Sequence, residues 1–182
     1  MDKDVFYTDY VEALNDKSVN DKSTNAKYAK LSEIVVPVYD FVLAYANYFN
    51  ERKDYGSGPK LTLVEVHILT QIYDNPGTTV TEIAKIWNRT TSAISQTVRK
   101  LMKQDLVYRE NSTSDGKVFH LYTTELGKET SMAHKRYDND DITNATDILL
   151  EKFSMEDLIK FSEICSYSHE ILSCELEKEN ED

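Results

Sequence analysis

The stretch from Thr79 to Gly127 constrains the fold of this 182-residue chain more than any other part. Its start, Thr79-Val80-Thr81-Glu82, has the form of a capping box, in which a threonine and a later glutamate satisfy free backbone amides at a helix start. Asn88-Arg89-Thr90 then interrupts the apolar pattern with residues that disfavour helix interiors. Thr90 can cap a second helix that runs to about Asp105. The stretch therefore predicts two helices joined by a tight turn.

The second predicted helix has one apolar and one polar face. At ~100° per residue, Ile94, Val98, Leu101 and Met102 share the apolar face. The polar residues opposite them are Ser92, Gln96, Arg99 and Lys103, with Ser95 and Lys100 at the margins. Hydroxyl, amide and cationic groups of this kind bond base edges and phosphates in a major groove. The alternative is a solvated face of an ordinary helix, because polar outer faces are universal.

A predicted hairpin follows this helix and favours the DNA-binding interpretation. The segments 106–109 and 118–122 are typical of strands, and the polar segment 111–116 between them is typical of a turn. Lys117 lies beside this turn, where a cation could enter a minor groove, and Thr124 can begin another helix. This order predicts a winged helix-turn-helix. The predicted fold class is mainly α with a small β-hairpin wing.

These motifs resemble the MarR family of bacterial transcriptional regulators, over about Tyr28 to Leu176. The resemblance is carried by Leu61-Thr62, Thr79–Ala84, Ile94-Ser95, Leu101, Asp115-Gly116-Lys117 and Thr124–Gly127. The chain departs from the family pattern at Asp105, Lys117 and Thr123, where glycine, arginine and leucine are usual. The resemblance implies a homodimer whose first and last helices interlock with those of a second subunit. It further implies an effector that changes the separation of the two DNA-binding heads.

The resulting domain organisation has four parts. Residues 1–27 form an acidic N-terminal extension with one short amphipathic helix and a flexible connection over 15–25. Residues 28–60 and 128–176 form a helical dimerisation region, residues 61–127 the DNA-binding region, and residues 177–182 an acidic tail. At Pro37 either a helix kinks or a new helix starts. The acidic segment 138–141 could kink or fray a later helix.

Charge is distributed unevenly along the chain. The net charge is −11, but residues 79–128 contain eight Lys/Arg and five Asp/Glu, so this window is +3 and the remainder −14. A locally basic head on an acidic body is expected to bind DNA with strong salt sensitivity. No apolar run is long enough for a membrane span, and the N-terminus lacks a signal-peptide pattern. We therefore expect a cytoplasmic protein without membrane association.

The sequence predicts two sets of site residues. The expected contacts to double-stranded DNA are Arg89, Thr91, Ser92, Ser95, Gln96, Arg99, Lys100, Lys103, Arg109 and Lys117. Tyr45, Phe49 and His67 are candidates for a pocket that binds a small aromatic effector. Packing in a core or dimer interface is the alternative for the aromatic residues, and a structural role is the alternative for His67.

Motifs for catalysis are absent from the sequence. It has no glycine-rich phosphate loop, nucleophile elbow or Cys-x-x-Cys pair, so an enzyme is not expected. The four histidines are scattered, so no metal site or cofactor is predicted, and a metal could bind only through tertiary assembly. Cys165 and Cys174 are nine residues apart, about 180° around a helix, and cannot pair within it.

The predicted function is a homodimeric DNA-binding regulator, a repressor relieved by its ligand at a near-palindromic operator. Two alternatives remain open. One is a winged-helix module that binds proteins rather than DNA, which the acidic body would suit. The other is a regulator that senses oxidants through Cys165 or Cys174 at a contact between subunits.

Overall fold

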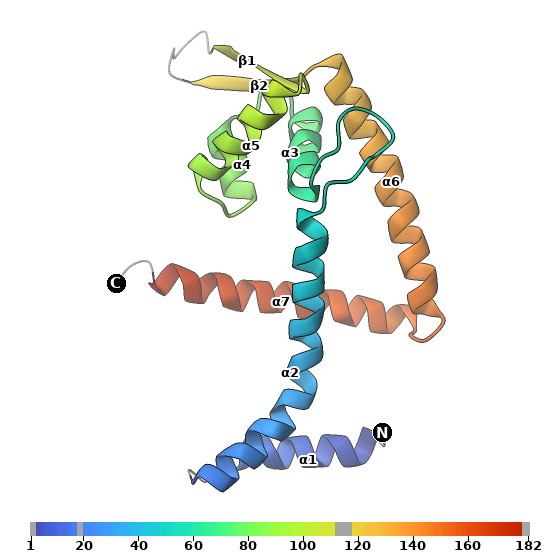
Figure 1. The fold of residues 1–182 in the computed structure, drawn as a ribbon. Coiled ribbons are helices and arrows are strands. Elements are labelled where there is room, and N and C mark those ends of the chain that lie inside the picture. Colours follow the sequence, from blue (N-terminus) through green and yellow to red (C-terminus); the bar gives the residue numbers. More distant parts are fainter. Residues whose placement is uncertain (1–2, 18–19, 112–117, 180–182) are drawn as a thin grey trace.

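The computed structural model describes residues 3–17, 20–111 and 118–179 as helices, a two-stranded hairpin and short connections (Figure 1). Its elements are α1 (Lys3–Asn15), α2 (Asp21–Asn50), α3 (Leu63–Asp74), α4 (Val80–Ile86), α5 (Thr91–Lys103), β1 (Val107–Asn111), β2 (Phe119–Thr123), α6 (Glu125–Leu150) and α7 (Met155–Glu179). Elements α3, α4, α5 and the hairpin form a head from which α2 and α6 extend, and α7 runs from the far end of α6 across α2. Among the described residues, no helix is both long and apolar enough to cross a membrane. The predicted fold class is confirmed.

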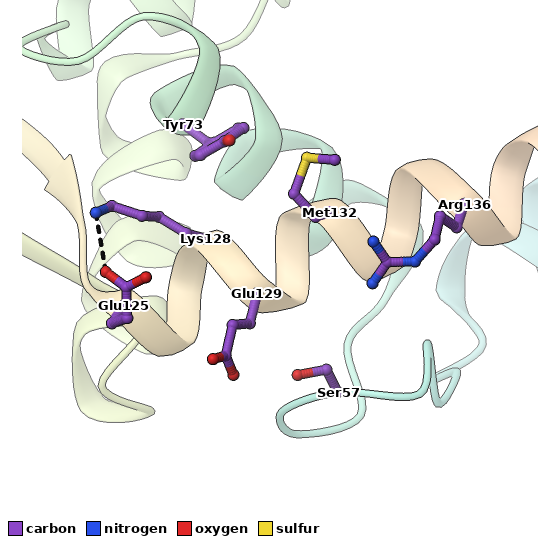
Figure 2. Close-up of a pocket in the computed structure, with 7 residues that line it drawn as sticks. All are labelled: Ser57, Tyr73, Glu125, Lys128, Glu129, Met132 and Arg136. Atoms are coloured by element: carbon purple, nitrogen blue, oxygen red, sulfur yellow. Dashed lines mark hydrogen bonds and ion pairs between the residues drawn. The ribbon is translucent and has the colours of Figure 1, made fainter.

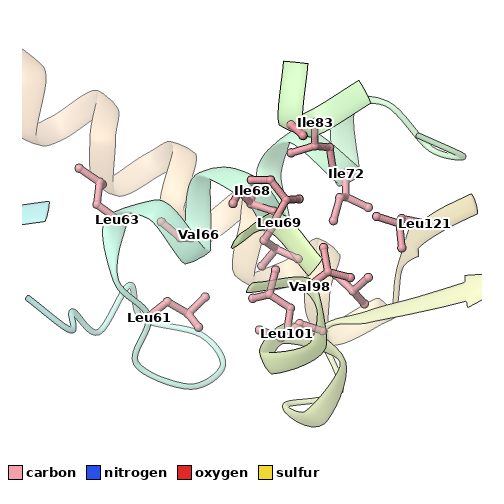
Figure 3. Close-up of a cluster of buried hydrophobic side chains, with 14 of the residues drawn as sticks. Leu61, Leu63, Val66, Ile68, Leu69, Ile72, Ile83, Val98, Leu101 and Leu121 are labelled. Carbon is pink, nitrogen blue, oxygen red and sulfur yellow. The ribbon is translucent and has the colours of Figure 1, made fainter. Parts of the chain in front are cut away.

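The core of the head forms around α3 (Figure 3). Val66, Ile68, Leu69 and Ile72 of this helix are fully buried, and α3 packs against α2, α5, α6 and β2. The other elements contribute buried apolar side chains that surround it, namely Leu61, Ile83, Ala84, Ile94, Val98, Leu101, Leu106, Val107 and Leu121. The core thus holds the two helices of the helix-turn-helix and the base of the hairpin in one unit.

Threonine side chains begin four helices of the head and its extension. Thr62 and Thr79 form capping boxes with Glu65 and Glu82. Thr90 accepts a hydrogen bond from the Ala93 amide, and Thr124 accepts one from the Gly127 amide. The helix starts predicted at Thr79, Thr90 and Thr124 are therefore confirmed.

The hairpin is attached to the head through backbone hydrogen bonds. Its strands are antiparallel, with Val107 opposite Thr123 and Asn111 opposite Phe119. The Leu121 amide donates a hydrogen bond to the Thr78 carbonyl at 2.9 Å, and the Gly77 amide donates one to the Leu121 carbonyl at 2.9 Å. Because Gly77 and Thr78 directly precede α4, these bonds tie β2 to the start of the helix-turn-helix.

Three places in the long helices test the prediction. The connection predicted over 15–25 is shorter, because Asn20 accepts from the Ser23 amide and α2 begins at Asp21. Pro37 lies inside α2, which remains one helix. Helix α6 continues through 138–141, where Asp138 lies beside two histidines and Asp141 accepts from the Tyr48 hydroxyl at 3.1 Å. Partners for these carboxylates explain why the acidic segment stays helical.

Gly127 gives a stability prediction whose sign is decided by one contact. A Cβ at this position would collide with the backbone carbonyl oxygen of Leu106, at the point where α6 packs on the start of β1. Helix propensity alone predicts that Gly127→Ala would stabilise the protein by about 1 kcal/mol. We expect destabilisation by about 1–3 kcal/mol instead, because the carbonyl belongs to the backbone and cannot move freely. Urea unfolding measures the difference.

Glu129→Ala is the matched control, since Glu129 is exposed two residues further along α6. It is expected to change the free energy of unfolding by less than about 0.5 kcal/mol. A Gly127→Ala protein as stable as the parent would show that the carbonyl of Leu106 does not constrain this position.

Candidate functional site

The turn between α4 and α5 sets the direction of the second helix. The Arg89 amide donates to the Ala84 carbonyl at 2.9 Å, and Asn88 adopts a left-handed backbone conformation with φ 46°. Asparagine tolerates this conformation better than most residues. Thr90 follows as the N-cap of α5. The local sequence therefore produces the tight turn of a helix-turn-helix.

Helix α5 presents the predicted polar face to solvent. Ile94, Val98 and Leu101 are buried on its inner side. The exposed residues of the predicted DNA-contacting set are Arg89, Thr91, Ser92, Gln96, Arg99, Lys100, Lys103 and Arg109, and Ser95 is half-buried. Lys117 lies outside the residues that the structure describes. The described members therefore all lie at the surface of the head, as DNA contact would require.

A groove separates α5 from the hairpin. It encloses about 210 Å³, and Ser95, Arg99, Arg109 and Phe119 are among its lining residues. The Arg109 guanidinium carbon lies 4.3 Å from the centre of the Phe119 ring, and the Arg99 Nε donates to the Ser95 carbonyl at 3.2 Å. The structure thus brings two arginines together where the helix meets the wing.

Lys100 lies on the other margin of α5. Its Nζ is 3.6 Å from Glu65 Oε1, and Glu65 is a buried residue at the start of α3. Lys100 and Ser95 are five positions apart, which is about 140° around a helix. The predicted DNA-contacting set therefore divides into residues near the wing, residues on the open face, and one lysine paired with the interior of the head.

Asp105 explains a departure from the family pattern noted in the sequence. Its φ is 57°, in the left-handed region where glycine is favoured. Its carbonyl accepts from the Thr124 hydroxyl at 2.6 Å, and the Thr124 amide donates to the Leu106 carbonyl at 3.1 Å. The chain therefore keeps the conformation that a glycine would adopt and holds it through the start of α6.

The three residues predicted to line an effector pocket take part in different ring contacts. The rings of Tyr45 and Phe49 contact each other on α2 with centroids 4.8 Å apart. His67 instead contacts His134 of α6, with ring centroids 4.9 Å apart. A cavity of about 450 Å³ is lined by other residues, Ser57, Tyr73, Glu125, Lys128, Glu129, Met132 and Arg136 (Figure 2).

His67, His134 and Asp138 form a compact cluster between α3 and α6. His67 Nε2 lies 3.6 Å from Asp138 Oδ2, and His134 Nδ1 lies 3.3 Å from Asp138 Oδ1. One possible ligand atom from each residue lies within 4.8 Å of the others. Imidazole nitrogens and a carboxylate oxygen are ligands that zinc accepts, and three protein ligands leave a fourth tetrahedral position for water.

The protonation state of His134 suits metal binding. Only 2% of His134 is exposed, and its Nδ1 makes no hydrogen bond despite its proximity to Asp138. Burial lowers the pKa of His134, nearby His67 and Lys135 lower it further, and Asp138 opposes the change. A neutral imidazole is the form that binds a metal. The side chain is therefore buried, neutral and without a hydrogen-bond partner at Nδ1.

Sequence patterns contain only a weak signal for this cluster. His134 and Asp138 are four residues apart, so they share one face of a helix. His67 lies 67 positions earlier and reaches them only through the packing of α3 against α6. The expectation that a metal could bind only through tertiary assembly describes this arrangement.

The head, its capped helix pair and its hairpin define a winged-helix DNA-binding protein. The model of the MarR family matches residues 61–119. The chain is 32% identical over 102 residues to the transcriptional regulator AdcR of Streptococcus pyogenes, covering 56% of this chain and 68% of that protein. The chain therefore belongs to the MarR family and is a transcriptional regulator.

Solved structures share the fold. A crystal structure of the adhesin competence repressor AdcR from S. pyogenes is 27% identical, with a TM-score of 0.57, and the match covers 78% of this chain and 97% of that chain. Lactococcus lactis ZitR, described as a zinc-responsive MarR family member, is 22% identical with a TM-score of 0.60 over 78% of this chain and 99% of that chain. At this identity the likeness to ZitR shows the fold alone.

The cap of α5 can be tested by changing Thr90. In Thr90→Ala the Ala93 amide loses its side-chain acceptor, so the free energy of unfolding should fall by about 1 kcal/mol. Thr90→Ser keeps the hydroxyl and should retain most of the stability. Urea unfolding of the three proteins measures both effects, and equal losses in the two variants would contradict a capping role.

Proposed function

We propose that this regulator acts in the cytoplasm as a homodimer on a near-palindromic operator, with α5 in the major groove and the hairpin beside the minor groove. The observation that carries this proposal is the exposed polar face of α5, which continues into the groove that contains Arg99 and Arg109. Arginine bonds guanine edges or phosphates in bidentate geometry. Two heads on a two-fold axis would read half-sites separated by about 10 bp or a multiple of it.

Exposed apolar side chains outside the head support the homodimer. None of the residues of α2, all of which the structure describes, is buried. The large exposed apolar side chains of α2 and α7 include Val38, Phe41, Val42, Leu43, Ile159, Phe161, Ile164, Ile171 and Leu172. Surfaces of this kind mark protein interaction sites. A second copy of the chain would cover them.

A divalent metal is the effector that the geometry favours over a small aromatic molecule. The cluster of His67, His134 and Asp138 offers three ligand atoms within 4.8 Å of one another, and His134 Nδ1 is buried without a hydrogen bond. No such convergence of polar groups accompanies Tyr45 and Phe49 among the described contacts. ZitR, which shares this fold, is a zinc-responsive MarR family member, in agreement with this assignment. The cluster joins α3 of the head to α6, where bound metal could alter the position of the head.

The alternative of a cysteine sensor has less support. Cys165 is an exposed free thiol on α7, and the side chain of Cys174 lies outside the described residues. Among the described side chains, no second cysteine could act as a resolving thiol for Cys165. A module that binds proteins instead of DNA would lack the salt dependence expected of the regulator.

Substitution of Arg99 tests the proposed DNA surface. On DNA selected from a random pool, Arg99→Ala should lower the affinity at least about tenfold and relax the base preference, since a bidentate contact contributes about 1–3 kcal/mol. Arg136→Ala is the control, because it removes an exposed arginine from α6 instead of α5. This variant should bind like the parent. Gel-shift titration distinguishes the outcomes, and equal binding by Arg99→Ala and the parent would place the DNA surface elsewhere.

Zinc titration tests the metal proposal. The parent should bind one zinc ion per chain in competition with a chromophoric chelator. His134→Ala should weaken binding by more than about 100-fold, because even groups that only support metal ligands contribute about 10–100-fold. His169→Ala, which changes an exposed histidine of α7, should bind zinc like the parent. The proposal fails if His134→Ala and His169→Ala bind zinc equally well.

A further inference from the structure

Glu65 is a buried carboxylate that lies between two cations, one from the segment after α2 and one from α5. Only 5% of its side chain is exposed. Its Oε2 lies 3.3 Å from Arg52 NH1, and its Oε1 lies 3.6 Å from Lys100 Nζ. Oε2 also accepts a hydrogen bond from the Thr62 amide at 3.0 Å, as part of the capping box. One side chain therefore contacts the segment just after α2, the start of α3 and the last turn of α5.

Because the Glu65 carboxylate is buried, its contacts with cations matter for the stability of the head. A carboxylate removed from water is costly unless cations and hydrogen bonds compensate for the lost solvation. Arg52 is itself held in place, since its NH2 donates to the Lys60 carbonyl at 2.7 Å. The cation from α5 therefore neutralises an interior charge and draws α5 towards the junction of α2 and α3.

The same geometry assigns Lys100 a role different from that of its neighbours. Among the described residues, Lys103 has no ion-pair partner. It lies three residues after Lys100, on the open face of α5. Lys100 lies at the margin of that face, opposite the wing groove, and points its charge at Glu65. If Lys100 turned to neutralise a DNA phosphate, the Glu65 carboxylate would lose one of its two neighbouring cations.

We propose that Glu65 and Lys100 are positioning residues, which hold the recognition helix at a fixed angle to the end of α2, and that Lys100 does not neutralise a DNA phosphate. This revises the expectation from the sequence that Lys100 contacts the backbone, and it rests on the proposed placement of α5 in the major groove. Because α2 is the proposed dimerisation helix, the pair links the dimer interface to the orientation of each α5.

Salt dependence separates a positioning lysine from one that binds phosphate. Each phosphate neutralised contributes about 0.9 to the slope of log affinity against log salt concentration. Lys103→Gln should reduce this slope by about one per subunit. Lys100→Gln should lower the affinity about three- to tenfold with an unchanged slope, because the orientation of α5 changes and no counterion release is lost. Lys100→Arg keeps the charge and should restore the affinity.

Glu65→Gln and the double variant with Lys100→Gln complete the design. If the two residues act as a pair, the double variant should bind no more weakly than the worse single variant, whereas independent residues would show additive losses. Circular dichroism of each protein confirms folding, and the comparison of Lys100→Gln with Lys103→Gln decides the question even if Glu65→Gln does not fold.

The outcomes distinguish this inference from the proposed DNA surface. A slope that falls by about one per subunit in Lys100→Gln would overturn the positioning role while supporting the placement of α5 on DNA. Unchanged slopes and affinities in both lysine variants would overturn the placement of α5 and the inference with it. An affinity loss with an intact slope in Lys100→Gln, together with a reduced slope in Lys103→Gln, would support both.

Discussion

The burial of α3 is the constraint on which the rest of the head depends. Its apolar residues face several directions, so a single neighbouring element could not cover them. Helices α2, α5 and α6 and strand β2 each pack against it. The recognition helix and the wing are therefore attached to the same helix, and that helix also supplies Glu65 and His67. Any change in the position of α3 must alter both the DNA surface and the contacts to the long helices.

Local signals made the head predictable from sequence. A threonine followed by glutamate, or a polar turn between two apolar segments, determines a helix start or a hairpin within a few residues. These signals correctly located the starts of α4, α5 and α6 and both strands to within a residue or two. The left-handed Asp105 shows why the position is usually glycine in this family. The polar face of α5 was equally visible, because it follows from helical periodicity alone.

Contacts over long distances in the chain were not predictable in this way. Glu65 follows Thr62 at capping-box spacing, but its proximity to Lys100 depends on how α3 packs against α5. His67 was considered a possible effector contact beside Tyr45 and Phe49, and packing against α6 places it with His134 and Asp138 instead. The sequence contains these residues without the distances between them. Tertiary packing therefore determines which polar residues can act together.

The two parts of the molecule reach stability by different physical routes. The head has a continuous core, whereas the long α2 buries none of its residues and α7 exposes a series of large apolar side chains. An isolated long helix gains little stability without packing of its apolar face. In the proposed dimer, order in α2 and α7 would depend on the second subunit, so folding of these helices and association would be linked. In that dimer, Arg52 would lie between α2, which depends on the second subunit, and the head, which has its own core. Its contact with Glu65 is one route by which the dimer interface would set the angle of the recognition helix.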